Sequence, residues 1–408
     1  MEVVSAIAPG ATQKIYIGPN TGQGVLDTYN KIVTDNTAKT ISTSWGLCES
    51  LSGDSFLNAL DTIFAQSVAQ GQAVFAASGD YGAYDCRDGV TLDVDSPASD
   101  PHVVGVGGTR LTVGAGGSYN CESVWSNNPY GVGGGLSSLF ARPGYQNGPG
   151  VNNLYPNGKR QAPDVSADAD PGYSVYCTAG SNCGGAGWIE VGGTSAGAPL
   201  WAALAADVNQ YLAANSQPRL GSASAALYAF FNATQQYRAY HDIVAGSNLH
   251  YLTTTGYDQA SGVGTPDVWN LARDAAVWLG AVSIATGMSE YNTAQPMQVT
   301  IYNLMNQPIY AFDTKANCSA LDLQLQVGPV WQPPSQAPCP LRRAADYDRG
   351  WGNLHGAHSR QHPHWRAQRV HARALPAGAA VRLVTHDHQH HRLLCVGHSV
   401  LVNCSLCG

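Results

Sequence analysis

The chain has 408 residues, of which 44% are apolar and only 12% charged, and its net charge is −7 with histidine neutral. The apolar content supports a large folded core, and the length allows one large domain with an appendage or two domains. No segment is long and apolar enough to span a membrane, and no nucleic-acid partner is expected.

Strand-like and helix-like segments alternate over residues 1–280. Residues 1–7 are expected at the edge of a strand. The expected buried strands are residues 14–17, 40–44 and 73–77. Helices are expected at residues 24–33 and 55–70. The alternation predicts an α/β fold with a doubly wound, mostly parallel sheet and helices on both faces, which places an active site at the carboxyl ends of strands.

The character of the chain changes after residue 280. Residues 298–302 and 321–327 alternate like strands with one solvated face, so 281–329 is predicted to be a small β-rich extension. Residues 330–408 hold nine Arg, three Asp and ten of the thirteen histidines, and are expected to be an irregular or out-of-frame tail. The alternative, a transition-metal site in its run of histidines at 386–391, is less favoured.

The ten cysteines show no paired C-x-x-C pattern and indicate disulfides in an oxidising compartment. Cys177 and Cys183 would close a short loop, Cys48 and Cys86 a longer one, and buried free thiols are the alternative. The low fraction of charged residues is also typical of exported proteins. Because no signal peptide is present, we expect that the N-terminal part of a secreted protein is missing.

The string Gly192-Gly193-Thr194-Ser195-Ala196-Gly197-Ala198-Pro199 precedes an amphipathic helix expected at 200–215. A hydroxyl at the positive end of a helix, beside unpaired N–H groups, favours a nucleophilic serine. A lone serine in such a place is more often an N-cap. The glycines on both sides and the G-T-S-A-x-x-P string favour Ser195 as a nucleophile.

A serine nucleophile needs a base, an orienting group and an oxyanion hole. His102 is the only histidine ahead of Ser195 and stands in no His-Gly context, so a histidine-based triad is not expected. Asp80, in Ser78-Gly79-Asp80, follows the strand expected at 73–77. A protonated Asp80 would donate a hydrogen bond to an oxyanion, which implies a reaction in acid; a turn aspartate is the alternative.

Together these motifs make residues 1–275 resemble the sedolisins, the serine-carboxyl peptidases with a subtilisin-like fold and a Ser-Glu-Asp triad. The matching pieces are Ala8-Pro9-Gly10-Ala11, Ser44-Trp45-Gly46, Ser78-Gly79-Asp80, Gly107-Gly108-Thr109, Gly133-Gly134-Gly135, Pro163-Asp164-Val165 and Gly192–Pro199.

The resemblance implies a role for each of these groups. Ser195 would be the nucleophile and Asp80 the oxyanion-hole acid, while Gly133, Gly134 and Gly135 would form an edge that pairs with an extended peptide substrate. It also implies a prodomain in the full-length protein.

A calcium ion is the implied cofactor. Asp242 and Asp258 would supply carboxylates, and Ile243, Thr254 and Gly256 backbone carbonyls, which is the oxygen-rich set that calcium prefers. The family commonly has glycine where this chain has Thr254, but a carbonyl ligand does not depend on its side chain.

The general base is the departure from the family. Aligning Ala8-Pro9-Gly10-Ala11 places the Glu-x-x-x-Asp pair ahead of Met1, and Glu2 lies on the wrong side of that position to replace it. We therefore expect an acid-acting endopeptidase fold whose chain, as given, is inactive. An internal start, a pseudogene and a trimmed fragment would all account for this, and a non-catalytic peptide-binding module is the functional alternative.

Overall fold

The computed structural model describes residues 1–155, 158–178, 187–233 and 238–279, together with the backbone of seven strands after residue 281. The chain divides into two compact units: Met1–Leu279 with Pro334–Cys339, and Gly280–Pro333 with Pro340–Gly408. Within the described residues, no helix combines the length and the apolar character that crossing a membrane requires.

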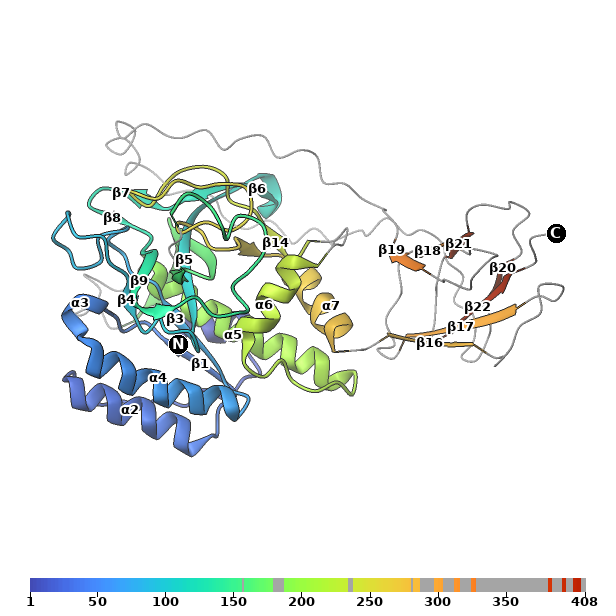
Figure 1. The fold of residues 1–408 in the computed structure, drawn as a ribbon, viewed down its shortest axis with the longest axis horizontal. Coiled ribbons are helices and arrows are strands. Elements are labelled where there is room, and N and C mark those ends of the chain that lie inside the picture. The colour runs from blue at the N-terminus through green and yellow to red at the C-terminus, as the bar shows by residue number, and fades with distance from the viewer. Residues whose placement is uncertain are drawn as a thin grey trace. The chain divides into compact units, whose positions relative to one another are not determined.

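A parallel sheet forms the centre of the first unit (Figure 1). Its order is β1 (Thr40–Thr43), β3 (Ala73–Ala77), β5 (Val104–Val113) and β11 (Val165–Asp170), all parallel, and β6 (Tyr119–Val124) pairs antiparallel with β5. Every residue of β3 is buried, as expected for a strand covered on both faces. The predicted α/β fold with a mostly parallel sheet is confirmed.

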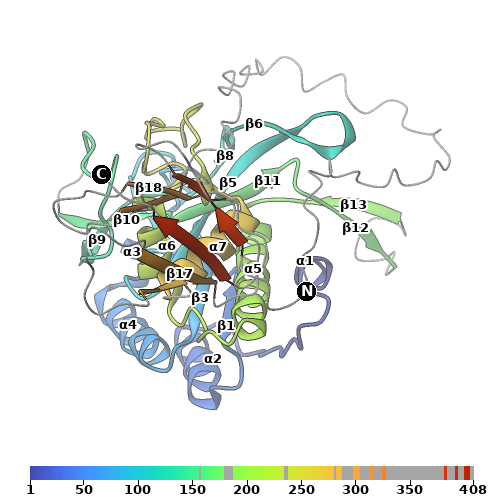
Figure 2. The ribbon, with the colours of Figure 1, turned by 90° about the vertical axis from the view of Figure 1, so that its right-hand side faces the viewer.

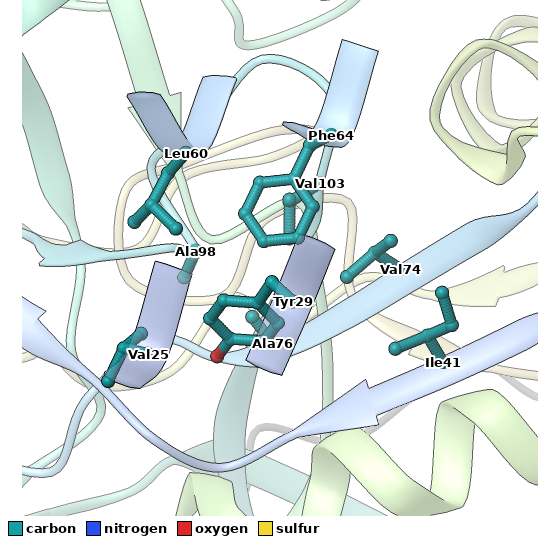
Figure 3. Packing of buried hydrophobic residues seen from close by; sticks show 9 residues of the cluster. All are labelled: Val25, Tyr29, Ile41, Leu60, Phe64, Val74, Ala76, Ala98 and Val103. Carbon is teal, nitrogen blue, oxygen red and sulfur yellow. The ribbon is translucent and has the colours of Figure 1, made fainter. Parts of the chain in front are cut away.

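Alternating side chains of β3 point into different layers of the core. Val74 and Ala76 join a cluster that includes Tyr29 of α2 (Gly22–Asp35) and Phe64 of α4 (Asp54–Ala69) (Figure 3). Phe75, between them, stacks on Trp201 of α5 at a ring-centroid distance of 6.4 Å. Because neighbouring side chains of a strand point to opposite faces, helices cover both faces of this sheet.

The other elements of this unit surround the central sheet and its two helices. They are α1 (Glu2–Ile7), β2 (Leu47–Cys48), α3 (Glu49–Ser52), β4 (Asp95–Ser96), η1 (Ala115–Gly117), β7 (Ser126–Asn127), β8 (Tyr130–Gly131), β9 (Gly135–Ala141), β10 (Lys159–Ala162), β12 (Tyr173–Cys177), β13 (Gly187–Val191), α6 (Ala223–Asn232), β14 (Tyr240–His241), β15 (Thr265–Pro266) and α7 (Val268–Trp278), while α5 spans Thr194–Ala214.

Two expectations for the first twenty residues are wrong. Residues 2–7 form the helix α1, which lies beside α5 (Figure 2). Residues 14–17 form no strand: Ile17 is 93% exposed, and Lys14 and Tyr16 bind Asp35 through their side chains. The sheet ends at β1 in the described chain, so these apolar residues have no strand beside them to pack against.

The second unit contains two sheets. Its strands are β16 (Val282–Thr286), β17 (Met297–Asn303), β18 (Phe312–Lys315), β19 (Gln324–Val327), β20 (Val381–Leu383), β21 (His391–Leu393) and β22 (Ser399–Cys404). The strands expected at 298–302 and 321–327 are present as β17 and β19. Within 330–408 the structure describes β20, β21 and β22: β22 and β21 pair with β17 and β18, and β20 pairs with β22. The irregular tail stays a prediction for the rest of this range. Residues 386–390 lie outside the described residues.

The Cys48–Cys86 disulfide is present. Cys121 and Cys177 are also disulfide-bonded, and Cys183, the predicted partner of Cys177, lies outside the described residues. These bonds confirm the prediction that cysteines of this unit form disulfides.

Candidate active site

Ser195 is exposed in the first turn of α5, while Ala196 and Ala198 beside it are buried. Gly193 precedes the helix with φ of 79°, a conformation that favours glycine. A Cβ on Gly197 would stand 3.1 Å from the Val106 side chain, so the small residues of the motif let the helix approach the sheet closely. The sequence thus buries one side of the first turn and leaves Ser195 in solvent.

Pro199 explains an otherwise unusual contact of Ser195. In a helix the N–H of residue 199 would donate to the carbonyl of residue 195, but proline has no N–H. The Ser44 hydroxyl donates to this carbonyl instead, at 2.8 Å. The proline of the motif and the serine of Ser44-Trp45-Gly46 are therefore linked through the backbone of Ser195.

Asp80 lies at the start of the same helix. It follows β3, and its Oδ1 accepts the Thr194 N–H at 2.9 Å and lies 2.8 Å from the Thr194 hydroxyl. Its Oδ2 faces Gly193, where an added Cβ would come within 2.9 Å. The structure thus brings Asp80 to the residue before Ser195, where the helix dipole favours a carboxylate.

The Ser195 hydroxyl has no hydrogen-bond partner among the described residues, so no described carboxylate is placed to accept its proton. Glu2 does not reach it: the Glu2 side chain is 72% exposed and pairs with the chain's own amino group at 3.4 Å. The expectation that Glu2 does not replace the general base agrees with this arrangement.

Two acids beneath the Asp80 loop, the buried Asp85 and the partly buried Asp95, were not foreseen. The Asp85 carboxylate accepts the Tyr81 N–H at 3.0 Å, and a Cβ on either Gly79 or Gly133 would come within 2.3 Å of it. Burial, with a contribution from neighbouring Asp95, raises the pKa of Asp85 well above its usual value, and burial raises the pKa of Asp95 to about 8. Both are therefore neutral in acid, and only the fold brings them together, since no pattern links them in sequence.

The role predicted for the glycine run, an edge that pairs with an extended peptide, stays a prediction. Gly133, Gly134 and Gly135 are all buried. The Gly133 N–H donates to the Gly79 carbonyl at 2.8 Å, and its carbonyl accepts the Ser78 hydroxyl at 2.7 Å. In this conformation Gly133 contacts the Asp80 loop closely through its backbone, and its N–H and its carbonyl each already have a partner.

The residues predicted to hold calcium meet in pairs. Asp242 accepts the Gly256 N–H at 3.0 Å, and Asp258 accepts the Thr254 N–H at 2.9 Å. The Ile243 side chain is buried in the core. Burial raises the pKa of Asp258 to about 6 and also raises the pKa of Asp242. Among the described residues neither carboxylate forms an ion pair. A cation with oxygen ligands would therefore offset the cost of burying Asp258 and of partly burying Asp242.

Comparison with known proteins shows which family the chain resembles. The profile of the Subtilase family matches residues 3–238. Kumamolisin from Bacillus sp. (strain MN-32) is 36% identical over 281 residues, which are 65% of this chain and 48% of that protein. Sedolisin from Pseudomonas sp. (strain 101) is 35% identical over 286 residues, 65% of this chain and 46% of that protein. The chain therefore spans about half the length of these curated relatives.

A solved structure is also similar to this chain. Pseudomonas sedolisin, described as a serine-carboxyl proteinase complexed with two molecules of pseudo-iodotyrostatin, superposes with a TM-score of 0.58 and is 32% identical. The match covers 66% of this chain and 75% of that one.

Proposed function

The chain belongs to the sedolisin family of the subtilases, and we propose that it carries the acyl-transfer site of an acid-acting serine-type endopeptidase. The observation that supports this most strongly is the joint position of Ser195 and Asp80 at the first turn of α5. Its substrates would be proteins or peptides.

In the proposed reaction the Ser195 hydroxyl oxygen attacks the substrate carbonyl carbon while its proton passes to a base. The carbonyl π bond breaks, and the resulting oxyanion lies against the amino end of α5, where first-turn N–H groups lack helical acceptors. Asp80 would donate a hydrogen bond to this oxyanion, which requires its protonated form and hence an acidic medium. The C–N bond then breaks, the amine leaves with a proton, and water releases the acyl group from Ser195.

The proton acceptor is the incomplete part of this site. The described residues place no carboxylate at the Ser195 hydroxyl, and loss of one triad member costs several orders of magnitude in rate. We propose that the 408-residue chain acylates very slowly by itself. A chain carrying a Glu-x-x-x-Asp segment ahead of Met1 is the matched comparison.

An active-site serine probe at about pH 4, near the ordinary pKa of aspartate, tests the proposal. We expect slow labelling of the chain and faster labelling of the extended chain, with Ser195→Ala unlabelled in both. Asp80→Ala should reduce labelling in the extended chain. If Ser195 is unlabelled even there, while an extended peptide still binds, the site is a peptide-binding module; the unpartnered Ser195 hydroxyl is what favours that second function.

A calcium ion is proposed between the Asp242 and Asp258 segments, with carbonyls of Ile243, Thr254 and Gly256 completing the oxygen ligands. Bound calcium would offset the negative charge of Asp242 and Asp258 and stabilise this loop, and it would take no part in the chemistry at Ser195. Calcium should raise the melting temperature of the chain. Asp258→Asn should abolish this rise, whereas Asp54→Asn, at an exposed helix start, should leave it unchanged.

We further propose that the protein works outside the cell after removal of a prodomain. The Cys48–Cys86 disulfide supports an oxidising compartment. Recovery of the protein in culture medium, with this bond intact by mass spectrometry, would agree with the proposal.

A further inference from the structure

A cluster of metal-ligating side chains lies toward the end of the sheet opposite Asp80. Asp61 comes from α4, while Asp100 and His102 come from the segment leading into β5. Since β3 and β5 run parallel, the entrance to β5 and the exit from β3 lie at opposite ends of the sheet. The cluster is therefore separate from the candidate active site.

The three side chains converge closely. His102 Nδ1 lies 2.8 Å from Asp61 Oδ1 and 3.6 Å from Asp100 Oδ1, and one ligand atom from each residue lies within 4.8 Å of the other two. Ligands about 2.0–2.1 Å from a tetrahedral zinc ion are roughly 3.3 Å apart. The observed spacings lie on both sides of this value, so small side-chain adjustments would admit an ion.

The buried carboxylate of Asp100 is an independent observation that points to a ligand at this cluster. Its side chain is 1% exposed, and its Oδ1 accepts the backbone N–H of His102 at 2.7 Å. Its Oδ2 is buried and has no hydrogen-bond partner among the described residues. An unpaired buried carboxylate oxygen is costly. A simple His102–Asp61 ion pair would explain the 2.8 Å contact but would leave this oxygen without a partner.

We propose that Asp61, Asp100 and His102 bind a divalent transition-metal ion of the zinc type. One imidazole nitrogen and two carboxylate oxygens suit zinc, whereas calcium prefers oxygen ligands alone. His102 and Asp61 are each about one third exposed (33% and 32%), so water can take the remaining position. The other such group in the described chain, Cys48, Cys86 and Asp93, has its two sulfur atoms bonded to each other.

The site would join α4 to the entrance of β5. The ion would link a helix on one face of the sheet to the strand that leads into the core, so its role is structural rather than catalytic. It does not depend on the proposed peptidase activity.

Zinc titration of the full chain at about pH 7.5, where imidazole is largely neutral, tests the site by nuclear magnetic resonance. Histidines are labelled with nitrogen-15, and the His102 signals are identified by their loss in His102→Gln. Zinc should shift the His102 signals, and EDTA should reverse the shift. The separate signals distinguish zinc binding at His102 from zinc binding at the histidines after residue 355.

Two substitutions separate a three-residue site from a single surface histidine. Asp100→Asn keeps the acceptor for the His102 N–H, and Asp61→Asn changes a partly exposed side chain, so both should fold. Each should raise the zinc concentration for half-maximal shift at least about tenfold, the lower end of what losing even an outer partner costs. The control His250→Gln removes an exposed histidine that contacts aromatic rings and should leave the His102 response unchanged. Unmoved His102 signals at zinc levels that shift other histidines, or equal responses in both aspartate variants and the wild type, would overturn the proposal.

Discussion

The hydroxyl of Ser44 donates a hydrogen bond of 2.8 Å to the carbonyl oxygen of Ser195, across 151 residues of sequence. It supplies the donor that Pro199 lacks, and it holds the first turn of α5 to the end of β1. Pro199 and Ser44 therefore act together on the Ser195 carbonyl: the proline removes its helical donor and the serine replaces it.

This relationship predicts a double-mutant effect. Ser44→Ala should lower the free energy of unfolding by about 0.5–1 kcal/mol, because both residues are exposed and water replaces part of the bond. In a Pro199→Ala background the helix N–H is restored, so the same Ser44→Ala change should cost less. Urea denaturation of the four proteins measures the coupling, and equal costs in both backgrounds would show that Pro199 has no part in it.

Gly193→Ala should damage the site in two ways. The residue has φ of 79°, which costs an alanine about 1–2 kcal/mol, and the new Cβ would stand 2.9 Å from Asp80 Oδ2. Gly53→Ala is the matched control, since Gly53 precedes α4 with φ of 78° and has open space around its Cα. We expect the Gly193 variant to be the less stable of the two by chemical denaturation. Equal losses of unfolding free energy in the two variants would mean that the Asp80 side chain moves away from the new Cβ without destabilising the protein.

Breaking the buried ion pair of Arg160 and Asp164 should strongly lower the free energy of unfolding. Both side chains are buried, Arg160 Nη1 donates to Asp164 Oδ1 at 2.8 Å, and the Gly105 N–H donates to Asp164 Oδ2 at 2.7 Å. Asp164→Ala leaves a buried positive charge and should cost about 3–5 kcal/mol. Lys31→Ala, which breaks an exposed pair with Asp35, should cost less than about 1 kcal/mol. Comparable melting temperatures for the two variants would contradict this ranking.

Stability should fall as the pH rises from about 4 to 8. Burial raises the pKa of Asp95 to about 8 and that of Asp168 to about 6, so the folded state holds protons that the unfolded state, with an aspartate pKa near 3.9, releases. Their contribution is complete below that lower pKa and is lost as the pH rises through the folded-state values.

Asp95→Asn provides the measurement for this pH effect. The neutral side chain should make the protein more stable than the wild type at pH 8 by at least about 1.4 kcal/mol, the equivalent of one pKa unit, and should flatten the pH profile. Denaturation midpoints between pH 4 and 9 record both effects. A wild-type profile that is flat, or that rises with pH, would contradict the assignment.

Local sequence patterns predicted most of the central layer correctly. The helices expected at 24–33 and 55–70 and the strands expected at 40–44 and 73–77 are present, because their apolar spacing matches the face that each element buries. Residues 14–17 alternate in a similar way but have no neighbouring strand in the described chain, so their apolar side chains have no sheet to pack against. The strands β20 to β22 were missed because partner strands far away in sequence define them.

By itself the sequence indicated the family, the position of Ser195 at the start of a helix and the Asp80 loop, since each is written in a short motif, and it offered Cys48–Cys86 as a candidate disulfide. Only the tertiary structure decided three contacts. The Ser44 hydroxyl binds the Ser195 carbonyl, Asp85 is buried and Asp95 partly buried near Asp80, and the Gly133 backbone groups already have partners. The physical reason is that these are contacts between segments far apart in the chain. Burial, pKa and the remaining hydrogen-bonding capacity of a group depend on what packs around it, which no local pattern specifies.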